Sequence, residues 1–238
     1  MTDFAEAMPH GDIHEVFPDV FFVTGTMKTV LMGSHWHFSR NMTIVRDGKD
    51  LTLINTVRLN DAGLAHLESL GTVKNIVKVD AMHGLDDAFY KERYSATVWA
   101  PAGMPHGNGL TTDKLLEPGG DMPFAGASVF VFEATKLPAC IVRIAREGGI
   151  LVACDALQNW VGPDAFFSDE SRKTMTEMGF FQSANIGPVW SMVNEPKAQD
   201  FVRLRDLPFN HALCGHGVPL RDRAREAFNA RFEQVFGI

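Results

Sequence analysis

Cysteine is scarce in this sequence, and none of the three residues forms a CxxC pair. Cys140, Cys154 and Cys214 each lie within an apolar run, which is typical of buried thiols in a reducing compartment. The N-terminal stretch 1–16 lacks the basic start and apolar segment of a signal peptide. No apolar run reaches the roughly 18 residues that span a bilayer. We therefore expect a cytoplasmic protein with no membrane partner.

Positive charge is also in short supply. The chain has 22 Lys and Arg against 29 Asp and Glu, a net charge of −7, which argues against a nucleic-acid partner because phosphate binding needs clustered cations. The sequence has no Gly-x-Gly-x-x-Gly loop of a Rossmann enzyme and no Gly-x-Ser-x-Gly nucleophile turn. Its 238 residues, 45% of them hydrophobic, fit one domain over residues 1–238.

Short strands dominate the first part of the chain. Asp47-Gly48 predicts a tight hairpin turn, because glycine accepts the positive φ that such a turn requires. Runs rich in β-branched and apolar residues predict strands at Val20–Thr24, Thr29–Met32, Met42–Arg46 and Leu51–Val57. We expect these runs to form an antiparallel meander.

Helices alternate with strands after this meander. Asn60 and Asp61 can cap a helix over Ala62–Leu70, with Gly71 at its end. Further strands are predicted at Val73–Val79, Ala96–Ala100, Ser128–Phe132, Ala139–Ala145 and Ile150–Cys154, and further helices at Asp86–Arg93, Ser168–Met178, Lys197–Leu204 and Pro219–Phe236. Each half therefore runs strands first and helices after. This order predicts an α/β (α+β) fold with four αββα layers, in which two mixed β-sheets pack face to face with helices outside.

Polar side chains follow several predicted strands. His83 and Asp87 lie after Val73–Val79, Asp155 ends Ile150–Cys154, and His216 stands between two glycines. Imidazole and carboxylate are the usual ligands of zinc, iron and manganese. Ordinary structural roles stay open for each of them, such as a helix cap or a turn residue. The glycines beside His216 predict a close approach of the backbone to a neighbouring group.

A second group of residues predicts the wall of a substrate pocket. In Ser34–Arg40, His35 and His37 face the same side of a strand, so that they form either a ligand pair or, as we favour, part of a pocket wall. The full set of wall candidates is His35, Trp36, His37, Arg40, His106 and Trp160. Their aromatic and Met-rich surroundings indicate a partly apolar substrate, although such residues also build ordinary cores.

In their order and spacing, these segments resemble the metallo-β-lactamase superfamily over nearly the whole chain. The resemblance rests on NMTIVRDGKDLTLINTV (41–57), VKNIVKVDAMHGLDD (73–87), ILVACDAL (150–157) and ALCGHGVPL (212–220). ILVACDAL is similar to the strand that delivers the superfamily's metal-bridging Asp. ALCGHGVPL is similar to its final ligand loop, where a His precedes the last helix. The resemblance implies an αββα fold and a metal site.

The signature loop departs from the superfamily pattern HxHxDH. If His83 takes the first place, Leu85 stands where the second His belongs, Asp87 keeps the Asp, and Ala88 replaces the last His. A register two residues earlier puts His83 second and Asp86 last. Either register leaves an incomplete set of ligands.

The resemblance then implies room for at most one metal ion. The ligands that remain are His83, Asp87, Asp155 and His216. Lys136 stands at or near the position of a further superfamily His, and an ammonium repels a divalent cation. We therefore also consider that Lys136 replaces the metal charge and neutralises Asp87 and Asp155. The sequence leaves open whether the site holds one zinc, iron or manganese ion or none.

Three functions are compatible with such a site. The preferred one is a hydrolase that acts on a small ester, lactone, thioester or phosphoester through at most one metal. A metal-free enzyme is the second, with His83 or His216 as the general base and Lys136 as the electrostatic stabiliser. The candidate catalytic residues are His83, Asp87 and Lys136. The third is a non-catalytic binding protein that keeps the fold. All three predict a small-molecule substrate or ligand, and all leave a homo-oligomer open.

Overall fold

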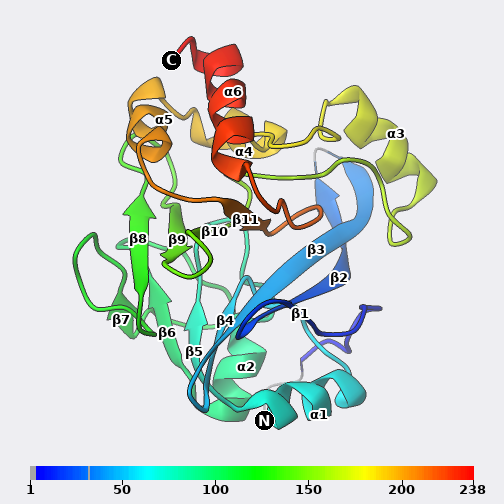
Figure 1. Cartoon of the computed structure of the whole chain (residues 1–238). Helices are drawn as coiled ribbons and strands as arrows, with labels where there is room; N and C mark the ends of the chain where they lie inside the picture. The colour runs from blue at the N-terminus through cyan, green and yellow to red at the C-terminus, as the bar shows by residue number, and fades with distance from the viewer. Residues whose placement is uncertain (1–3, 32) are drawn as a thin grey trace.

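The computed structural model describes residues 4–31 and 33–238, which form two β-sheets covered by helices (Figure 1). Residues 1–3 and Met32, the last residue of a predicted strand, lie outside the described residues. The strands are β1 (His14–Phe17), β2 (Val20–Leu31), β3 (Ser34–Asp47), β4 (Asp50–Ile54), β5 (Thr72–Val77), β6 (Thr97–Ala100), β7 (Lys114–Leu115), β8 (Ala127–Val131), β9 (Cys140–Ile144), β10 (Ile150–Ala153) and β11 (His211–Cys214). The helices are α1 (Asp61–Leu70), α2 (Asp87–Tyr94), α3 (Asp169–Glu177), α4 (Pro188–Asn194), α5 (Ala198–Arg205) and α6 (Ala224–Phe236).

Both sheets are mixed. The larger runs in the order β1-β2-β3-β4-β5-β6-β7; pairing is antiparallel from β1 to β4 and parallel from β4 to β7. The smaller runs in the order β11-β10-β9-β8, and only its β10–β11 pair is parallel. The parallel pair matters for function, because the carboxyl ends of β10 and β11 deliver residues to the same edge.

Three apolar layers hold the sheets and helices together. Between the sheets, residues such as Phe22 and Ile54 of the larger sheet pack in one cluster with Val142 and Val152 of the smaller. A second cluster joins the larger sheet to α1 and α2, and a third joins the smaller sheet to α4, α5 and α6. Figure 1 shows these helices at opposite ends of the molecule, outside the two sheets. The arrangement confirms the predicted αββα order.

The β2–β3 hairpin extends beyond the sheet and carries one wall of the candidate site. Its strands pair without interruption from Val20 opposite Val45 to Leu31 opposite Ser34. The half near the sheet is buried on both faces, whereas the far half of β2 alternates between exposed and half-buried residues. The start of β3 is held against α3, since the His37 amide donates to Ser171 Oγ at 2.7 Å.

Element boundaries differ from the sequence predictions where the chain bends or extends. The predicted strand Val20–Thr24 and residues 29–31 of the predicted strand Thr29–Met32 belong to the single strand β2, because the pairing with β3 continues through Gly25. The last helix begins at Ala224 rather than at Pro219, because Asp222 and Arg223 adopt positive φ. The strands β1, β7 and β11 and the helix α4 were not predicted.

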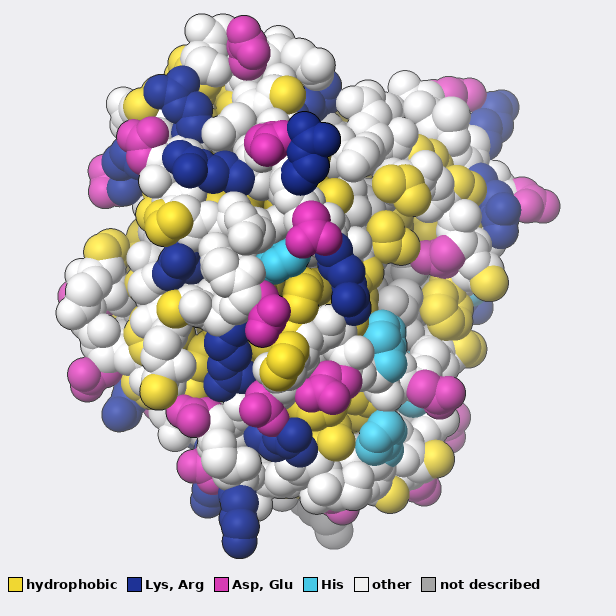
Figure 2. Space-filling view, viewed as in Figure 1, with side chains coloured by type: hydrophobic (Ala, Val, Ile, Leu, Met, Phe, Trp, Pro, Cys, Tyr) yellow, Lys and Arg dark blue, Asp and Glu magenta, His cyan; other side chains and the backbone are white. Residues whose placement is uncertain are grey.

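Charges of both signs are interspersed over the face of the molecule shown in Figure 2. On the right of the same view, hydrophobic side chains reach the surface near α3 and the hairpin. None of the helices in the described part of the chain has the length and apolar character needed to cross a membrane.

Candidate functional site

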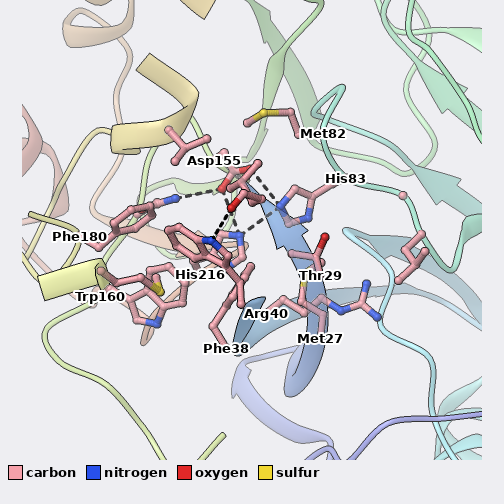
Figure 3. Close-up of a pocket in the computed structure, with 17 residues that line it drawn as sticks. Met27, Thr29, Phe38, Arg40, Met82, His83, Asp155, Trp160, Phe180 and His216 are labelled. Carbon is pink, nitrogen blue, oxygen red and sulfur yellow. Dashed lines mark hydrogen bonds and ion pairs between the residues drawn. The ribbon is translucent and has the colours of Figure 1, made fainter. Parts of the chain in front are cut away.

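Three of the predicted metal ligands meet at the bottom of one cavity. Asp155 follows β10, His216 follows β11, and His83 lies in the loop between β5 and α2. Asp155 Oδ2 lies 3.0 Å from His83 Nε2, Asp155 Oδ1 lies 3.1 Å from His216 Nε2, and the two Nε2 atoms are 3.1 Å apart. Figure 3 shows both imidazoles pointing toward the carboxylate.

The surrounding structure fixes how His216 presents its ring. Its Nδ1 donates to the Ser39 carbonyl oxygen at 2.9 Å, since a carbonyl oxygen can only accept. The ring stacks on Trp160, with centroids 4.6 Å apart and an interplanar angle of 28°. Because the proton of a neutral imidazole is then on Nδ1, the lone pair of Nε2 faces Asp155 and is free to bind a cation.

The charge states within this cluster also suit a metal. Burial disfavours ionisation of Asp155, but the two neighbouring imidazoles outweigh it and hold the pKa of this carboxyl well below its usual range. Gln158 Nε2 donates to Asp155 Oδ1 at 2.9 Å and helps to orient it. Burial lowers the pKa of His83, so its ring is neutral at pH 7. An ionised carboxylate and neutral imidazoles are the forms that bind metals.

The donor atoms fit one metal ion. Bonds of about 2.0–2.2 Å around a single ion place neighbouring ligand atoms about 2.8–3.1 Å apart in octahedral coordination and about 3.3–3.6 Å apart in tetrahedral coordination. The separations in the cluster are 3.0–3.1 Å. When His216 carries its proton on Nδ1, its Nε2 and Asp155 Oδ1 are both hydrogen-bond acceptors, and they lie 3.1 Å apart. Two acceptors repel each other at this distance, and a cation bound between them would make the contact favourable. Two histidines and one carboxylate are a common set for iron and also suit zinc and manganese.

Cys154 is a further candidate that the sequence analysis assigned to the core. Its Sγ, a ligand atom of His83 and one of Asp155 lie within 4.8 Å of one another. The thiol is buried, and burial raises its pKa far above the usual range. Cys154 therefore stands in the protonated form beside the cluster. Cys154 directly precedes Asp155 in the sequence, which could have indicated a position beside the cluster. The apolar run around it instead predicted a core residue.

The loop that carries His216 needs its glycines, as the sequence predicted. Gly217 has a φ of +88°, and a Cβ atom there would come within 2.1 Å of the Asn159 carbonyl oxygen. Asn41 holds the same loop, because its Nδ2 donates to the carbonyl oxygens of Cys214 and Gly217 at 3.0 and 2.7 Å. The position of His216 thus depends on close backbone packing between two loops and β3.

We expect Gly217→Ala to lower the free energy of unfolding by about 3 kcal/mol, because it adds both a positive-φ penalty and a steric clash. The matched control is Gly109→Ala, where φ is +69° but nothing lies within 4 Å of the added Cβ; it should lose only about 1 kcal/mol. Urea unfolding of both variants measures the difference. Equal losses would show that the contact with Asn159 relaxes at no cost.

The structure does not bring Asp87 to this cluster. Asp87 is the first residue of α2, it is buried, and its Oδ1 accepts a hydrogen bond from Thr56 Oγ1 at 2.6 Å. The neighbouring Asp86 forms an ion pair with Arg40 and accepts from the Arg58 amide. Both carboxylates therefore tie the loop that carries His83 to neighbouring segments, and Asp87 is absent from the lining of the cavity.

The prediction that Lys136 lies beside Asp87 and Asp155 is wrong. Lys136 has a 59% exposed side chain and forms an ion pair with Glu195 at 2.6 Å, because the turn before β9 projects into solvent. The buried cation is Lys78 instead, which follows β5 and is only 5% exposed. Its Nζ donates to the Pro105 carbonyl oxygen at 2.5 Å and is attracted by Asp87 and Asp80.

The predicted wall residues divide into two groups. Trp36, Arg40 and Trp160 line the cavity above the cluster. The structure corrects the prediction for the other three. His35 and His37 line a neighbouring depression beside α3, which shares Thr29 and Trp36 with the cavity. The His106 ring interacts with Thr112 Oγ1 at 2.8 Å. Strand alternation explains the first correction, because Trp36 points opposite to its two neighbours.

The cavity has a volume of about 180 Å³ and joins the polar cluster to an apolar wall (Figure 3). Its lining residues are Met27, Thr29, Leu31, Trp36, Phe38, Arg40, Met82, His83, Gly84, Leu85, Asp155, Gln158, Trp160, Met175, Phe180, Val189 and His216. The hairpin, the loop 82–85, α3 and α4 all contribute to it. Sequence reasoning did not find Met27, Met175, Phe180 or Val189, since nothing in their local patterns separates them from core residues.

Comparison with known proteins identifies the fold alone. No family model matches the chain, and no curated protein matches its sequence. Solved structures do match. The metallo-β-lactamase DIM-1, exposed to ceftazidime, is 15% identical, with 98% of this chain and 99% of that chain covered and a TM-score of 0.60. The mono-zinc form of FIM-1 from Pseudomonas aeruginosa is also 15% identical, with 97% of each chain covered and a TM-score of 0.57.

A flavo di-iron protein variant from Thermotoga maritima has a higher TM-score of 0.64. It is 14% identical, and the match covers 93% of this chain and 61% of that one. The three neighbours share the αββα arrangement despite low sequence identity. The chain therefore has the metallo-β-lactamase fold, as the resemblance in its sequence predicted.

Proposed function

We propose, from the metallo-β-lactamase fold of this chain and its cluster of donor atoms, a hydrolase that holds one metal ion through His83, Asp155 and His216. The observation that carries the proposal is the mutual separation of 3.0–3.1 Å between these donors at the bottom of an open cavity. Among the structural neighbours, FIM-1 is described in a mono-zinc form and the Thermotoga maritima protein as di-iron. Zinc, iron and manganese are the candidate ions.

Each residue of the cluster has a distinct part in this proposal. His83 and His216 supply nitrogen donors, and Asp155 supplies the negative charge. Ser39 and Gln158 orient His216 and Asp155 through hydrogen bonds at 2.9 Å, an outer layer of support that metal ligands commonly need. When bound, a divalent ion would polarise a substrate oxygen and make a water molecule more acidic.

The cavity restricts the reaction to a small substrate. An ester, lactone, thioester or phosphoester presents an electrophilic carbon or phosphorus next to an oxygen that a cation can polarise. The aromatic wall of Trp36, Phe38 and Trp160 would hold the remainder of the substrate and exclude bulk water from the cluster. Exclusion of water strengthens every electrostatic interaction inside the site.

Metal binding is the direct test of the proposal. We expect the purified chain to bind one equivalent of Zn²⁺ or Mn²⁺ in a calorimetric titration, and elemental analysis after gel filtration should give the same ratio. His83→Ala should abolish stoichiometric binding, because it removes one of three donors. The matched control is His37→Ala, which removes an imidazole outside the cavity. Two bound equivalents, or loss of binding in the control alone, would contradict the assignment.

A metal-free binding protein is the second candidate, and one observation favours it. His83 Nε2–H can donate to Asp155 Oδ2 at 3.0 Å, which closes that part of the cluster without an ion. The version of this candidate that relied on Lys136 loses its support, because Lys136 pairs with Glu195 at the surface. A chain that binds no metal but still binds ligands in the cavity would favour this function over the hydrolase.

A further inference from the structure

The cavity above the cluster of His83, Asp155 and His216 is lined mainly by apolar side chains. Ten of its lining residues are apolar: Met27, Leu31, Trp36, Phe38, Met82, Leu85, Trp160, Met175, Phe180 and Val189. Four of them form a continuous aromatic surface. The Trp160 ring stacks on His216, and Phe180 contacts both Trp160 and Trp36 with centroids 5.9–6.0 Å apart. Met27 and Leu31 of the hairpin and Met175 of α3 line the same cavity, and Figure 3 shows Trp160 and Phe180 beside His216 and Asp155.

The charges of the lining give the site little to offer an anion. Arg40 is the one Lys or Arg among the lining residues in the described part of the chain. Its guanidinium is already paired with Asp86, and it donates to the Thr56 carbonyl oxygen. Only its Nε–H lacks a partner among the described residues. Beyond the proposed metal ion, a charged group on the remainder of a substrate would meet one compensated cation and a wall of hydrocarbon, which is costly for that group.

The mouth of the cavity continues the apolar character. Met82 and Leu85 flank His83 in the chain, and their side chains are 38% and 61% exposed. Large apolar side chains beside a reacting centre stay in water at a cost, unless a partner or substrate covers them. A chain that runs from the aromatic wall past His83 would cover both.

We propose that the cavity binds the acyl chain of an uncharged ester or thioester, with its carbonyl group at His83, Asp155 and His216. This inference rests on the proposed hydrolase function and narrows its substrate class. Water adds its oxygen to the carbonyl carbon, and the bond from that carbon to the ester oxygen or thioester sulfur breaks. The products are the acid, which releases a proton at neutral pH, and an alcohol or thiol.

Apolar cavities of about 150 Å³ bind ligands such as benzene, so about 180 Å³ suits an acyl chain of about six to eight carbons.

The kinetic test uses the metal-loaded protein and p-nitrophenyl esters of acetate, butyrate, hexanoate and octanoate. Each added methylene group that becomes buried contributes about 0.8 kcal/mol, which corresponds to a factor of about four in kcat/KM. We expect this rise as far as hexanoate or octanoate, the same trend for the matching thioesters, and no measurable turnover of bis-p-nitrophenyl phosphate. A flat dependence on chain length, or preference for the phosphodiester, would overturn the inference.

A binding test separates this inference from the proposed function. Octanamide is uncharged and resists hydrolysis, and Trp36 and Trp160 report its binding by fluorescence. Its four additional methylene groups should make it bind about 200 times more tightly than butyramide, with or without metal. If octanamide binds but no ester is hydrolysed, the hydrolase proposal fails and the acyl cavity stands. If esters are hydrolysed but octanamide binds no more tightly than butyramide, the acyl cavity is wrong.

Two pairs of variants locate the effect. Val189→Phe narrows the cavity from α4 and should remove the preference for octanoate over butyrate, while Val193→Phe lies on the same helix outside the cavity and should keep it. Because a core change can disturb folding, Leu85→Ser provides a test at the exposed mouth and should weaken octanamide binding several-fold. Unchanged selectivity in both Val189→Phe and Leu85→Ser would contradict the proposed position of the chain.

Discussion

Replacing Asp155 by Asn is expected to reduce hydrolysis by about a thousandfold, because the activating effect of a bound metal is worth several kcal/mol. Asn keeps the shape of the side chain but removes the charge that lies 3.0 and 3.1 Å from the two imidazoles. The affinity for metal should fall with it. The measurement pairs kcat/KM on p-nitrophenyl hexanoate with metal content at several concentrations of Zn²⁺, so that loss of the ion is distinguished from loss of rate at full occupancy.

The matched control for this substitution is Asp113→Asn, which removes a carboxylate that pairs with Lys91 far from the cavity lining. It should leave both kcat/KM and metal content unchanged. Circular dichroism and the unfolding midpoint verify that Asp155→Asn still folds, as expected when a buried charge becomes a neutral amide of the same size. Full activity in Asp155→Asn would remove this carboxylate from the proposed site.

Much of the fold was predictable because the sequence patterns reflect burial directly. Strands such as β10, buried along its whole length, read as continuous apolar runs, and α1 shows both its Asn60 cap and its apolar face. The elements that were missed have weak patterns. β7 is two residues long, and α4 begins at Pro188 with no capping side chain. Their structure depends on packing partners that are distant in the sequence.

The ligand positions that could be predicted from the sequence are those where a His or an Asp directly follows a strand. Asp155 and His216 follow two strands that are parallel neighbours, so their meeting follows from topology. Lys136 was assigned to the site because it stands at or near the position of a superfamily His. No local sequence pattern could show that its turn faces solvent. Lys78 did carry a signal, since it interrupts the apolar run Ile76–Val79, and a lysine in such a run needs a buried partner.

Lys78→Met is expected to lower the free energy of unfolding by about 3 kcal/mol, because it removes the buried ammonium that attracts Asp87 and donates to the Pro105 carbonyl oxygen. Lys78 and Asp87 both lie against Gly84, where a Cβ atom would come within 3.0 Å of Lys78 Nζ and 2.5 Å of Asp87 Oδ2. Burial raises the pKa of Asp87, whereas the hydrogen bond from Thr56 to Oδ1 and the attraction of the Lys78 ammonium favour its charged form. Its Oδ2 has no hydrogen-bond partner among the described residues. In a chain of this length, the melting temperature should fall by about 10 °C.

Two further variants decide whether charge compensation is the cause. The double variant Lys78→Met, Asp87→Asn removes both charges, and we expect it to recover most of the lost stability, since the carboxylate no longer stands alone. Lys136→Met should leave the melting temperature unchanged, because exposed ion pairs contribute little. Should the double variant be no more stable than Lys78→Met, the loss would come from packing around the lysine stem. In that case neither Lys78 nor Lys136 would stabilise the fold by compensating the charge of a buried carboxylate.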